Sequence, residues 1–238
     1  MTRIINMWAA PRNISTAMMY AWNQRSDTTV LDEPMYAHFL DVTGLDHPMR
    51  DEVLEALPRH EHAVLELMLG SEVYTPLLFI KNMAHHIVGM DRGFIKDMTG
   101  FILTRDPIDM IPSLSRGLGR VPSLADTGYE DQVEILDETL ASGATPIVVD
   151  SGAVLNDPGV TLSALCEALG VPFDPAMLSW PVGPKSIDGV WGPHWYTRLH
   201  ATTGFEPPLS TGEALPPELA DTYALCEPLY ERLTEYAI

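Results

Sequence analysis

The stretch Pro11-Arg12-Asn13-Ile14-Ser15-Thr16 carries the side chains of an anion-binding site. It follows an apolar run over residues 3–10 and precedes apolar residues that recur at helical spacing. The predicted order is therefore a buried strand, a short turn and a helix that begins at Ser15 or Thr16. Amides in the first turn of a helix have no acceptor within the helix, and Arg12 adds a planar fork of donors that suits phosphate or sulfate. We interpret the stretch as an anion site. An ordinary turn with a serine cap and a surface arginine stays open as the alternative.

Apolar runs elsewhere in the chain predict further strands, with helical patterns between them. The predicted strands cover residues 3–10, 28–33, 76–80, 100–104 and 146–149. Their alternation with helical segments predicts an α/β fold, with a parallel sheet of about five strands flanked by helices on both faces. Such sheets bind ligands beyond the carboxyl ends of their strands. Four charged residues follow or end a predicted strand, and we expect them to converge on one crevice: Arg12, Glu33, Lys81 and Arg105.

Two segments interrupt this alternation within what we predict to be a single domain over residues 1–238. Residues 36–72 have helical spacing in pieces, broken at Pro48 and Pro58. Residues 179–217 are rich in Pro, Gly, Trp and His without a period, so we expect a long ordered loop. Its aromatic stretch contains Trp191, His194, Trp195, Tyr196 and His200. A lid over a ligand and packing over a sheet edge both remain open for this stretch.

The composition excludes two classes of partner. Acidic residues outnumber basic ones by 33 to 14, and a net charge of −19 repels nucleic acid and anionic lipid. No apolar run reaches the roughly 18 residues of a membrane span, and the first predicted strand leaves no room for a signal peptide. Cys166 and Cys226 lie on apolar helix faces, so we expect two buried thiols. We therefore expect a cytoplasmic protein with neither nucleic acid nor membrane as a partner.

A second segment, residues 102–117, combines a strand end with a capped helix start. Ser113 lies eight residues after Arg105, about two helical turns along. Together with residues 11–16, this segment resembles the two nucleotide-binding signatures of the PAPS-dependent sulfotransferases, where PAPS is 3′-phosphoadenosine 5′-phosphosulfate. The matching residues are Pro11, Arg12, Ser15 and Thr16 in the first signature and Arg105, Pro107, Asp109 and Ser113 in the second. The chain is most similar to short bacterial sulfotransferase-like proteins with a P-loop nucleotide-binding fold.

The resemblance implies a co-substrate, a reaction and a set of binding residues. It implies that PAPS donates a sulfuryl group to a hydroxyl or amine of a small-molecule acceptor, without a metal ion. The 3′-phosphate would lie on Arg105 and Ser113, and the segments 36–72 and 179–217 would line the acceptor pocket. A homodimer is among the assemblies that we expect. The residues implied to hold the 5′-phosphosulfate are Arg12, Asn13, Ile14, Ser15 and Thr16.

Departures from the family's pattern change the expected chemistry. Ile14 stands where the animal enzymes have glycine, so the turn must form without a residue that readily adopts positive φ. Met83 stands where those enzymes have their catalytic histidine, two residues after Lys81, so the base must lie elsewhere. We favour Glu33, because it ends the second predicted strand and several bacterial relatives carry their base after this strand. A solvated carboxylate, or one paired with an arginine, is the alternative for Glu33.

The remaining roles follow from charge and from position. Arg12 and Lys81 are predicted to stabilise the charge of the transferring group. His85 and His86 are the next candidates for the base, because imidazole titrates near neutral pH. They have no third partner at a diagnostic spacing, so we do not predict a metal site.

Two other functions stay open at this point. A member of this fold could hold a nucleotide without transferring a group. A nucleotide kinase is disfavoured, because the chain lacks the motif G-x-x-x-x-G-K-[ST]. The family's C-terminal Arg-Lys-Gly is also missing, which leaves Lys185 and Arg198 as candidates for further phosphate contacts.

Overall fold

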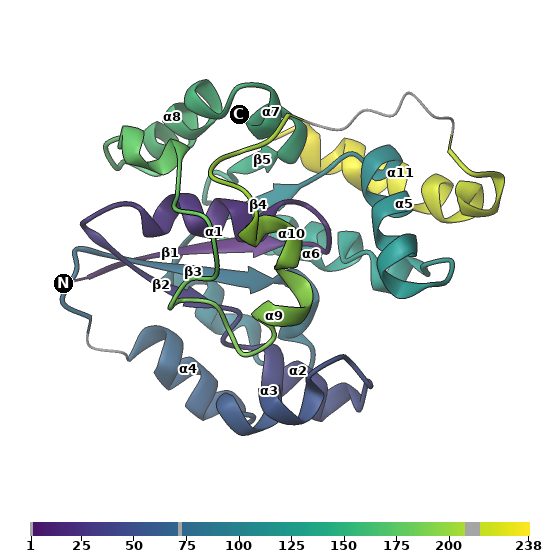
Figure 1. The fold of residues 1–238 in the computed structure, drawn as a ribbon, viewed down its shortest axis with the longest axis horizontal. Helices are drawn as coiled ribbons and strands as arrows, with labels where there is room; N and C mark the ends of the chain where they lie inside the picture. The colour runs from purple at the N-terminus through teal and green to yellow at the C-terminus, as the bar shows by residue number, and fades with distance from the viewer. Residues whose placement is uncertain (1, 71–72, 208–214) are drawn as a thin grey trace. The chain divides into compact units, whose positions relative to one another are not determined.

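The computed structural model describes residues 2–70, 73–207 and 215–238, and it has the predicted α/β architecture (Figure 1). Five strands form one sheet in the order β2-β3-β1-β4-β5. They are β1 (Arg3–Ala9), β2 (Thr28–Asp32), β3 (Leu77–Met83), β4 (Thr99–Thr104) and β5 (Val148–Asp150). β2 pairs in parallel with β3, and β4 pairs in parallel with β5. The prediction of a parallel sheet of about five strands flanked by helices is confirmed.

The described helices follow the strands in chain order. The α-helices are α1 (Ser15–Asn23), α2 (Tyr36–Thr43), α3 (Arg50–Ala56), α4 (Glu61–Leu69), α5 (Pro107–Leu118), α6 (Tyr129–Ala141), α7 (Ser151–Asn156), α8 (Pro158–Ala168), α9 (Gly192–Trp195), α10 (Thr197–His200) and α11 (Ala220–Thr234). Short 3-10 helices are η1 (Ala84–Ile87), η2 (Arg92–Asp97), η3 (Leu124–Asp126), η4 (Pro175–Leu178) and η5 (Pro217–Leu219). Among the described residues, no helix is both long and apolar enough to cross a membrane.

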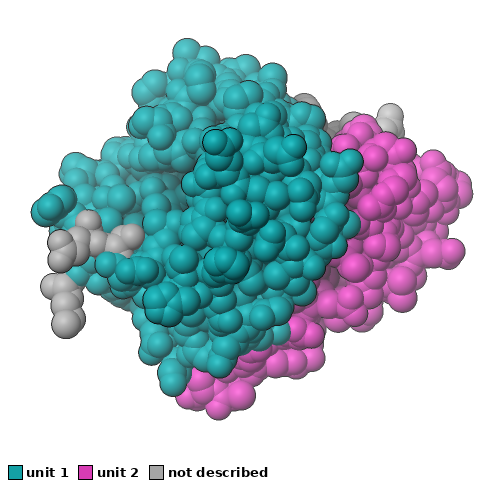
Figure 2. All heavy atoms as spheres, turned by 90° about the horizontal axis from the view of Figure 1, so that it is seen from below, with its two compact units in different colours: residues 1–7, 16–100, 174–204 teal, residues 8–15, 101–173, 205–238 magenta. Residues whose placement is uncertain are grey.

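The chain divides into two compact units (Figure 2). Unit 1 consists of Met1–Met7, Thr16–Gly100 and Asp174–Gly204, and unit 2 consists of Trp8–Ser15, Phe101–Phe173 and Phe205–Ile238. Residues of β1 belong to both units, and the single-domain organisation stays a prediction.

Aromatic packing anchors α1 in unit 1. Trp22 is fully buried and stacks on Phe79 of β3, with ring centroids 4.8 Å apart. Met18 and Ala21 of the same helix are also fully buried. Burying a large apolar side chain stabilises a fold by roughly 1.5–3 kcal/mol, so this face of α1 fixes the helix on the sheet.

A helix cap joins β4 to α5 in unit 2. The Asp106 carboxylate accepts a hydrogen bond from the Ile108 amide at 2.9 Å, and Pro107 occupies the first helical turn. This is the predicted helix start. The cap gives a hydrogen-bond partner to an amide of the first helical turn that has no acceptor within the helix, so α5 can begin soon after β4 ends.

Two strand ends differ from those predicted. β2 ends at Asp32, and Glu33 lies just beyond it with φ of 42°. The third strand was expected to end at Lys81, but β3 continues through Lys81 and Asn82 to Met83. A charged or amide side chain indicates a strand end only when it lacks partners within the protein and must therefore be solvated. Here both are buried and paired, Asn82 donating to Asn6 at 2.7 Å.

Two loop regions also differ in part from expectation. Residues 36–72 form separate helices broken near both prolines, as predicted over their described part. Residues 179–217 contain α9 and α10, so the expectation of a loop without helices is wrong for the described part of this range. Residues 208–214 lie outside the described residues. Cys166 and Cys226 are both buried, as predicted.

Candidate active site

The two signature segments meet in unit 2. Arg12 donates a hydrogen bond from Nε to Ser113 Oγ at 3.0 Å, across 101 residues of sequence. Arg105 donates from its guanidinium to the backbone carbonyl of Arg12 at 2.8 Å. Arg12 is exposed, whereas Arg105 and Ser113 are half-buried, so these side chains form one accessible group. Two guanidiniums and a hydroxyl in this arrangement can bind an anion such as phosphate or sulfate.

The turn before α1 has a strained backbone. Arg12 and Ile14 have φ of 64° and 60°, in the left-handed region that non-glycine residues rarely adopt. Ile14 is β-branched, which makes this conformation more costly still. The turn thus forms without the glycine of the animal enzymes, as the sequence requires, and Ile14 itself adopts the positive φ that glycine would adopt at lower cost.

Side chains buried around the turn hold this conformation. Asn13 is 1% exposed and donates from Nδ2 to the carbonyl of Leu103 in β4. Ser151, at the start of α7, lies 2.8 Å from the Asn13 carbonyl and 2.6 Å from the Thr104 carbonyl, and can donate its one proton to either. Strained residues persist where surrounding contacts determine their conformation in this way, and such residues cluster at functional sites.

Helix α6 supports the same region, and sequence reasoning missed its role. Gln132 is fully buried and donates from Nε2 to the carbonyls of Leu103 and Trp8, at 2.8 and 3.2 Å. Tyr129 donates its hydroxyl proton to the carbonyl of Arg105. The available signal was a glutamine on the apolar face of a helix, where a buried amide must have partners.

A second group of predicted site residues lies in unit 1. Lys81 is 1% exposed, and its ammonium donates to Asp32 Oδ1 at 2.9 Å, to Glu33 Oε1 at 2.5 Å and to the Tyr196 hydroxyl at 2.7 Å. An ammonium has three N–H groups, so these three acceptors use all of them. Lys81 is therefore the centre of a buried ionic cluster, which we define as Asp32, Glu33, Lys81 and Tyr196.

The segment that contains α9 completes this cluster. Trp191 donates from its indole N–H to the Tyr196 hydroxyl at 2.7 Å. The Gly189 amide donates to Asp32 Oδ2 at 3.0 Å. Trp191 and Tyr196 belong to the aromatic stretch for which lid and packing were both open. Tyr196 contacts Asp32 at the end of β2, which is an edge strand of the sheet, and it also contacts the catalytic candidate Lys81, so both interpretations stay open. The sequence around Tyr196 has no periodic pattern that would have predicted its position in this cluster.

Burial and charge shift the pKa values of the cluster. Burial raises the pKa of Glu33, and the nearby Lys81 ammonium opposes that effect without cancelling it. Burial alone would lower the pKa of Lys81, but the Asp32 and Glu33 carboxylates outweigh it and the pKa is raised. Burial and the same two carboxylates raise the pKa of Tyr196 well above its ordinary value, so its phenol stays protonated. Lys81 is therefore cationic, and Glu33 is a stronger base than an exposed glutamate.

His86 is the histidine that lies beside Glu33. Its Nδ1 is 3.7 Å from Glu33 Oε2, which is too long for a hydrogen bond. Its ring stacks on Tyr36 with centroids 4.7 Å apart, and its centroid is 4.6 Å from that of His85. Burial, followed by the charges of neighbouring histidines, lowers the pKa of His86 well below its ordinary value. The imidazole is therefore neutral near neutral pH.

The predicted site residues form two groups, one within each unit. Arg12, Arg105 and Ser113 form one group in unit 2, while Glu33 and Lys81 form another in unit 1. Convergence of all four charged groups on one crevice stays a prediction. Lys185 places its ammonium over the Tyr20 ring, 4.9 Å from the ring centroid, in unit 1. Ser15 and Thr16 begin α1, as predicted.

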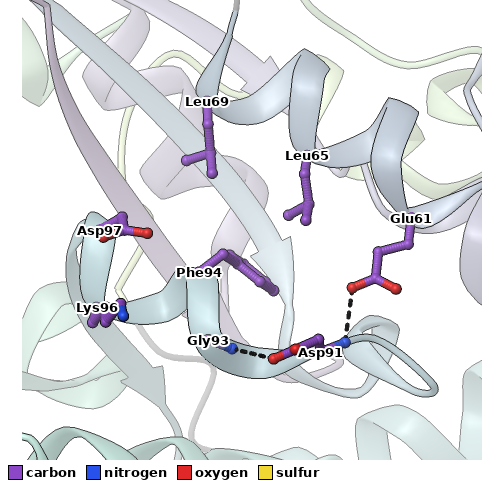
Figure 3. Close-up of a pocket in the computed structure, with 8 residues that line it drawn as sticks. All are labelled: Glu61, Leu65, Leu69, Asp91, Gly93, Phe94, Lys96 and Asp97. Carbon is purple, nitrogen blue, oxygen red and sulfur yellow. Dashed lines mark hydrogen bonds between the residues drawn. The ribbon is translucent and has the colours of Figure 1, made fainter.

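A hollow of about 440 Å³ lies elsewhere in unit 1, beside α4 and η2 (Figure 3). Its lining residues are Glu61, Leu65, Leu69, Asp91, Gly93, Phe94, Lys96 and Asp97. Three carboxylates and one ammonium make this lining net negative, so it is poorly suited to an anionic nucleotide. Within the described residues, no three or more His, Cys, Asp or Glu side chains are grouped so as to hold a metal ion.

Comparison with known families identifies the domain type. A family model described as a sulfotransferase domain matches residues 2–234. The chain is also similar to branched-chain-amino-acid aminotransferase-like proteins 1 and 2 of Arabidopsis thaliana, at 36% and 34% identity. These matches cover 98% and 97% of this chain but 42% and 41% of the two plant proteins. The chain thus spans about two fifths of the length of the curated relatives it matches.

Solved structures with the same fold are also sulfotransferases. The sulfotransferase domain of the Synechococcus PCC 7002 olefin synthase has a TM-score of 0.52 at 18% identity, with 94% of each chain covered. The sulfotransferase domain of the curacin biosynthetic pathway has a TM-score of 0.51 at 15% identity, with 99% of this chain and 97% of that chain covered. A sulfotransferase from Alicyclobacillus acidocaldarius has a TM-score of 0.51 at 14% identity, with 99% and 95% covered. At these identities the similarity concerns the fold.

Proposed function

This chain belongs to the sulfotransferase domain family, and on that basis we propose that it transfers a sulfuryl group from PAPS to a hydroxyl or amine of a small-molecule acceptor. The observation that carries the proposal is the meeting of Arg12, Arg105 and Ser113, which come from the two signature segments. The bond from Arg12 to Ser113, which lies within α5, joins the two segments across 101 residues of sequence, as a shared binding site requires.

The residues of unit 2 fit the anionic groups of the donor. Arg105 and Ser113 would hold the 3′-phosphate, and Arg12 with the first amides of α1 would hold the 5′-phosphosulfate. The Asn13 side chain is buried and donates a hydrogen bond to the carbonyl of Leu103 in β4. Asn13 and Ile14 would therefore act through the shape of the turn, and their backbone rather than their side chains would face the donor.

Glu33 would act as the general base. In the reaction, the bond from sulfur to the leaving phosphate oxygen breaks while a bond from sulfur to the acceptor oxygen or nitrogen forms. The acceptor loses a proton, which Glu33 would take up, and adenosine 3′,5′-bisphosphate leaves. The raised pKa of Glu33 favours this role over that of an exposed carboxylate, because a base is most effective when its pKa lies near the working pH.

Lys81 would stabilise the transferring group only after a change of partner. All three of its N–H groups are used by Asp32, Glu33 and Tyr196, so a contact with the donor needs the exchange of one of them. The same observation supports a second candidate function, in which the chain binds the nucleotide without transfer. Aminotransfer, suggested by the names of the plant relatives, is not proposed, because the matched family model describes a sulfotransferase domain over residues 2–234.

A binding measurement and a transfer measurement together test the proposal. Adenosine 3′,5′-bisphosphate without Mg²⁺ should raise the melting temperature, and adenosine 5′-monophosphate should do so less, because it lacks the 3′-phosphate. Transfer of label from ³⁵S-PAPS to metabolites in an extract should then reveal the acceptor. Binding without transfer to any acceptor would favour the second candidate. Stabilisation only by ATP with Mg²⁺ would contradict both.

A further inference from the structure

The Tyr196 hydroxyl lies within 3.4 Å of five polar atoms. Which of these atoms can donate and which can accept determines the direction of the hydroxyl proton. A phenol has one proton to donate and two lone pairs that accept. The Lys81 ammonium and the Trp191 indole N–H, each 2.7 Å away, can only donate, so they occupy both lone pairs. The hydroxyl proton must then point to a carboxylate. Asp32 Oδ2 at 2.8 Å is nearer than Glu33 Oε1 at 3.4 Å.

The adjacent carboxylates of Asp32 and Glu33 consequently accept different numbers of short hydrogen bonds. Asp32 accepts from Lys81, from Tyr196 and from the Gly189 amide at 3.0 Å. Glu33 has one short contact, which is from Lys81 to Oε1, and its Oε2 lies 3.7 Å from His86 Nδ1. Hydrogen bonds to a carboxylate favour its charged form, and Glu33 receives fewer short ones than Asp32, so this arrangement favours proton uptake at Glu33.

We propose that Tyr196 is a positioning residue that holds the Asp32 carboxylate beside Lys81 and directs proton uptake to Glu33. The proposal rests on the proposed function in one respect, namely that Glu33 is the base. It assigns a role to a residue from the aromatic stretch of residues 191–200, and it separates two neighbouring acids that sequence alone treats alike. Besides Asp32 and Lys81, the titratable groups that face Glu33 are His86 from η1, Tyr36 from α2 and Tyr196 itself.

Carboxyl titration by NMR tests the proposal without any need for activity. The whole chain is labelled with ¹³C at the carboxyl carbons of Asp and Glu, and the two signals are assigned with Glu33→Gln and Asp32→Asn. In the wild-type chain, the upper titration step should move the Glu33 signal and leave the Asp32 signal in place. Two signals that move together in the wild type would overturn the proposal directly, even if no variant of Tyr196 folds.

The variant Tyr196→Phe removes the hydroxyl and keeps the ring. Asp32 then loses one of its donors, and the two carboxyl groups should share the proton and titrate in the same step. Tyr20→Phe is the matched control, because Tyr20 also donates its hydroxyl proton to this segment, to Asp188 Oδ1 at 2.7 Å, rather than to a carboxylate of the cluster. The control should keep the wild-type pattern. If both variants leave Glu33 titrating alone, Tyr196 only packs the segment and the proposal is wrong.

The outcome also separates the proposal from the proposed function. An absence of sulfuryl transfer would contradict the enzyme. It would leave the role of Tyr196 intact if the upper titration step is confined to Glu33 in the wild type and is shared in Tyr196→Phe. Transfer that proceeds with the two signals moving together would support the enzyme and refute the role of Tyr196.

Discussion

Lys81 gives the sharpest test of the buried cluster, because removing its charge leaves two carboxylates without their shared cation. Lys81→Met keeps the length of the side chain, and Lys81, Asp32 and Glu33 are 1%, 2% and 10% exposed in their side chains. Breaking a buried ion pair by removing one partner costs about 3–5 kcal/mol. For a chain of this size each kcal/mol corresponds to about 2–4 °C, so the melting temperature should fall by about 6–20 °C.

The loss of stability in Lys81→Met should depend on pH, and the pKa of Glu33 determines whether the loss grows or shrinks as pH rises. Without the ammonium that opposes burial, the pKa of Glu33 in the folded variant should rise further above its unfolded value. A carboxyl group with a raised pKa binds its proton more tightly in the folded state, so stability is lost as pH rises through that pKa. The deficit of the variant should therefore be small near pH 4 and grow toward pH 8. Urea denaturation of both proteins across this range measures it.

Two further variants control the measurement. Lys96→Met removes an exposed lysine from η2 and should change the free energy of unfolding by less than about 0.5 kcal/mol. Adding Asp32→Asn and Glu33→Gln to Lys81→Met removes the unpaired charges, so part of the lost stability should return. A loss below about 1 kcal/mol in Lys81→Met, or a loss that does not grow with pH, would refute the buried cluster as described.

Three other predictions concern the donor site, the base and the support from α6. Arg105→Ala should weaken adenosine 3′,5′-bisphosphate by about ten- to a hundredfold, from roughly 1.5–3 kcal/mol for a charge-assisted contact, with little change for adenosine 5′-monophosphate. Equal losses for both nucleotides, by titration calorimetry, would exclude a 3′-phosphate contact. Glu33→Gln should lower turnover by about a hundred- to ten-thousandfold while nucleotide binding survives, and wild-type turnover should fall at low pH through a pKa above that of an ordinary glutamate. A loss under tenfold with an alcohol acceptor would point to His86 instead. Gln132→Leu leaves the carbonyls of Trp8 and Leu103 short of a donor and should cost about 1–3 kcal/mol in urea denaturation, whereas a cost below about 0.5 kcal/mol would show that the amide is dispensable.

The sequence predicted the parts of the fold that depend on local pattern. Apolar runs predicted all five strands to within a few residues, and the Asp106-Pro107 pair predicted the start of α5. The pairing of the two signatures was also within reach, because strand ends in a parallel sheet share one edge and the signature spacing fixes Ser113 two helical turns from Arg105. The strands and the start of α5 were predicted correctly because period and cap are properties of neighbouring residues.

The buried cluster lay beyond the same reasoning. A lysine after an apolar run predicts a strand end, because an unpaired charge must reach water. Lys81 escapes this rule only because Asp32, Glu33 and Tyr196 supply three acceptors, and Tyr196 comes from 115 residues further along the chain. A contact over that separation does not affect the local sequence pattern. The sequence therefore showed that Lys81 carries a charge, but it did not show which residues pair with that charge.

Backbone strain is concentrated at residues that the sequence had already indicated as site residues. Four described non-glycine residues have positive φ, and three of them are Arg12, Ile14 and Glu33, all predicted site residues. Ile14 looked like an obstacle to the turn, because glycine would adopt this conformation without cost. The buried hydrogen bonds of Asn13 and Ser151 hold the neighbouring peptides, so the turn forms despite the isoleucine. Such strain costs of order 1–3 kcal/mol per residue and lowers the stability of the fold. Its concentration at residues chosen from the sequence for their chemistry is an argument, independent of the signatures, that these positions are constrained by function.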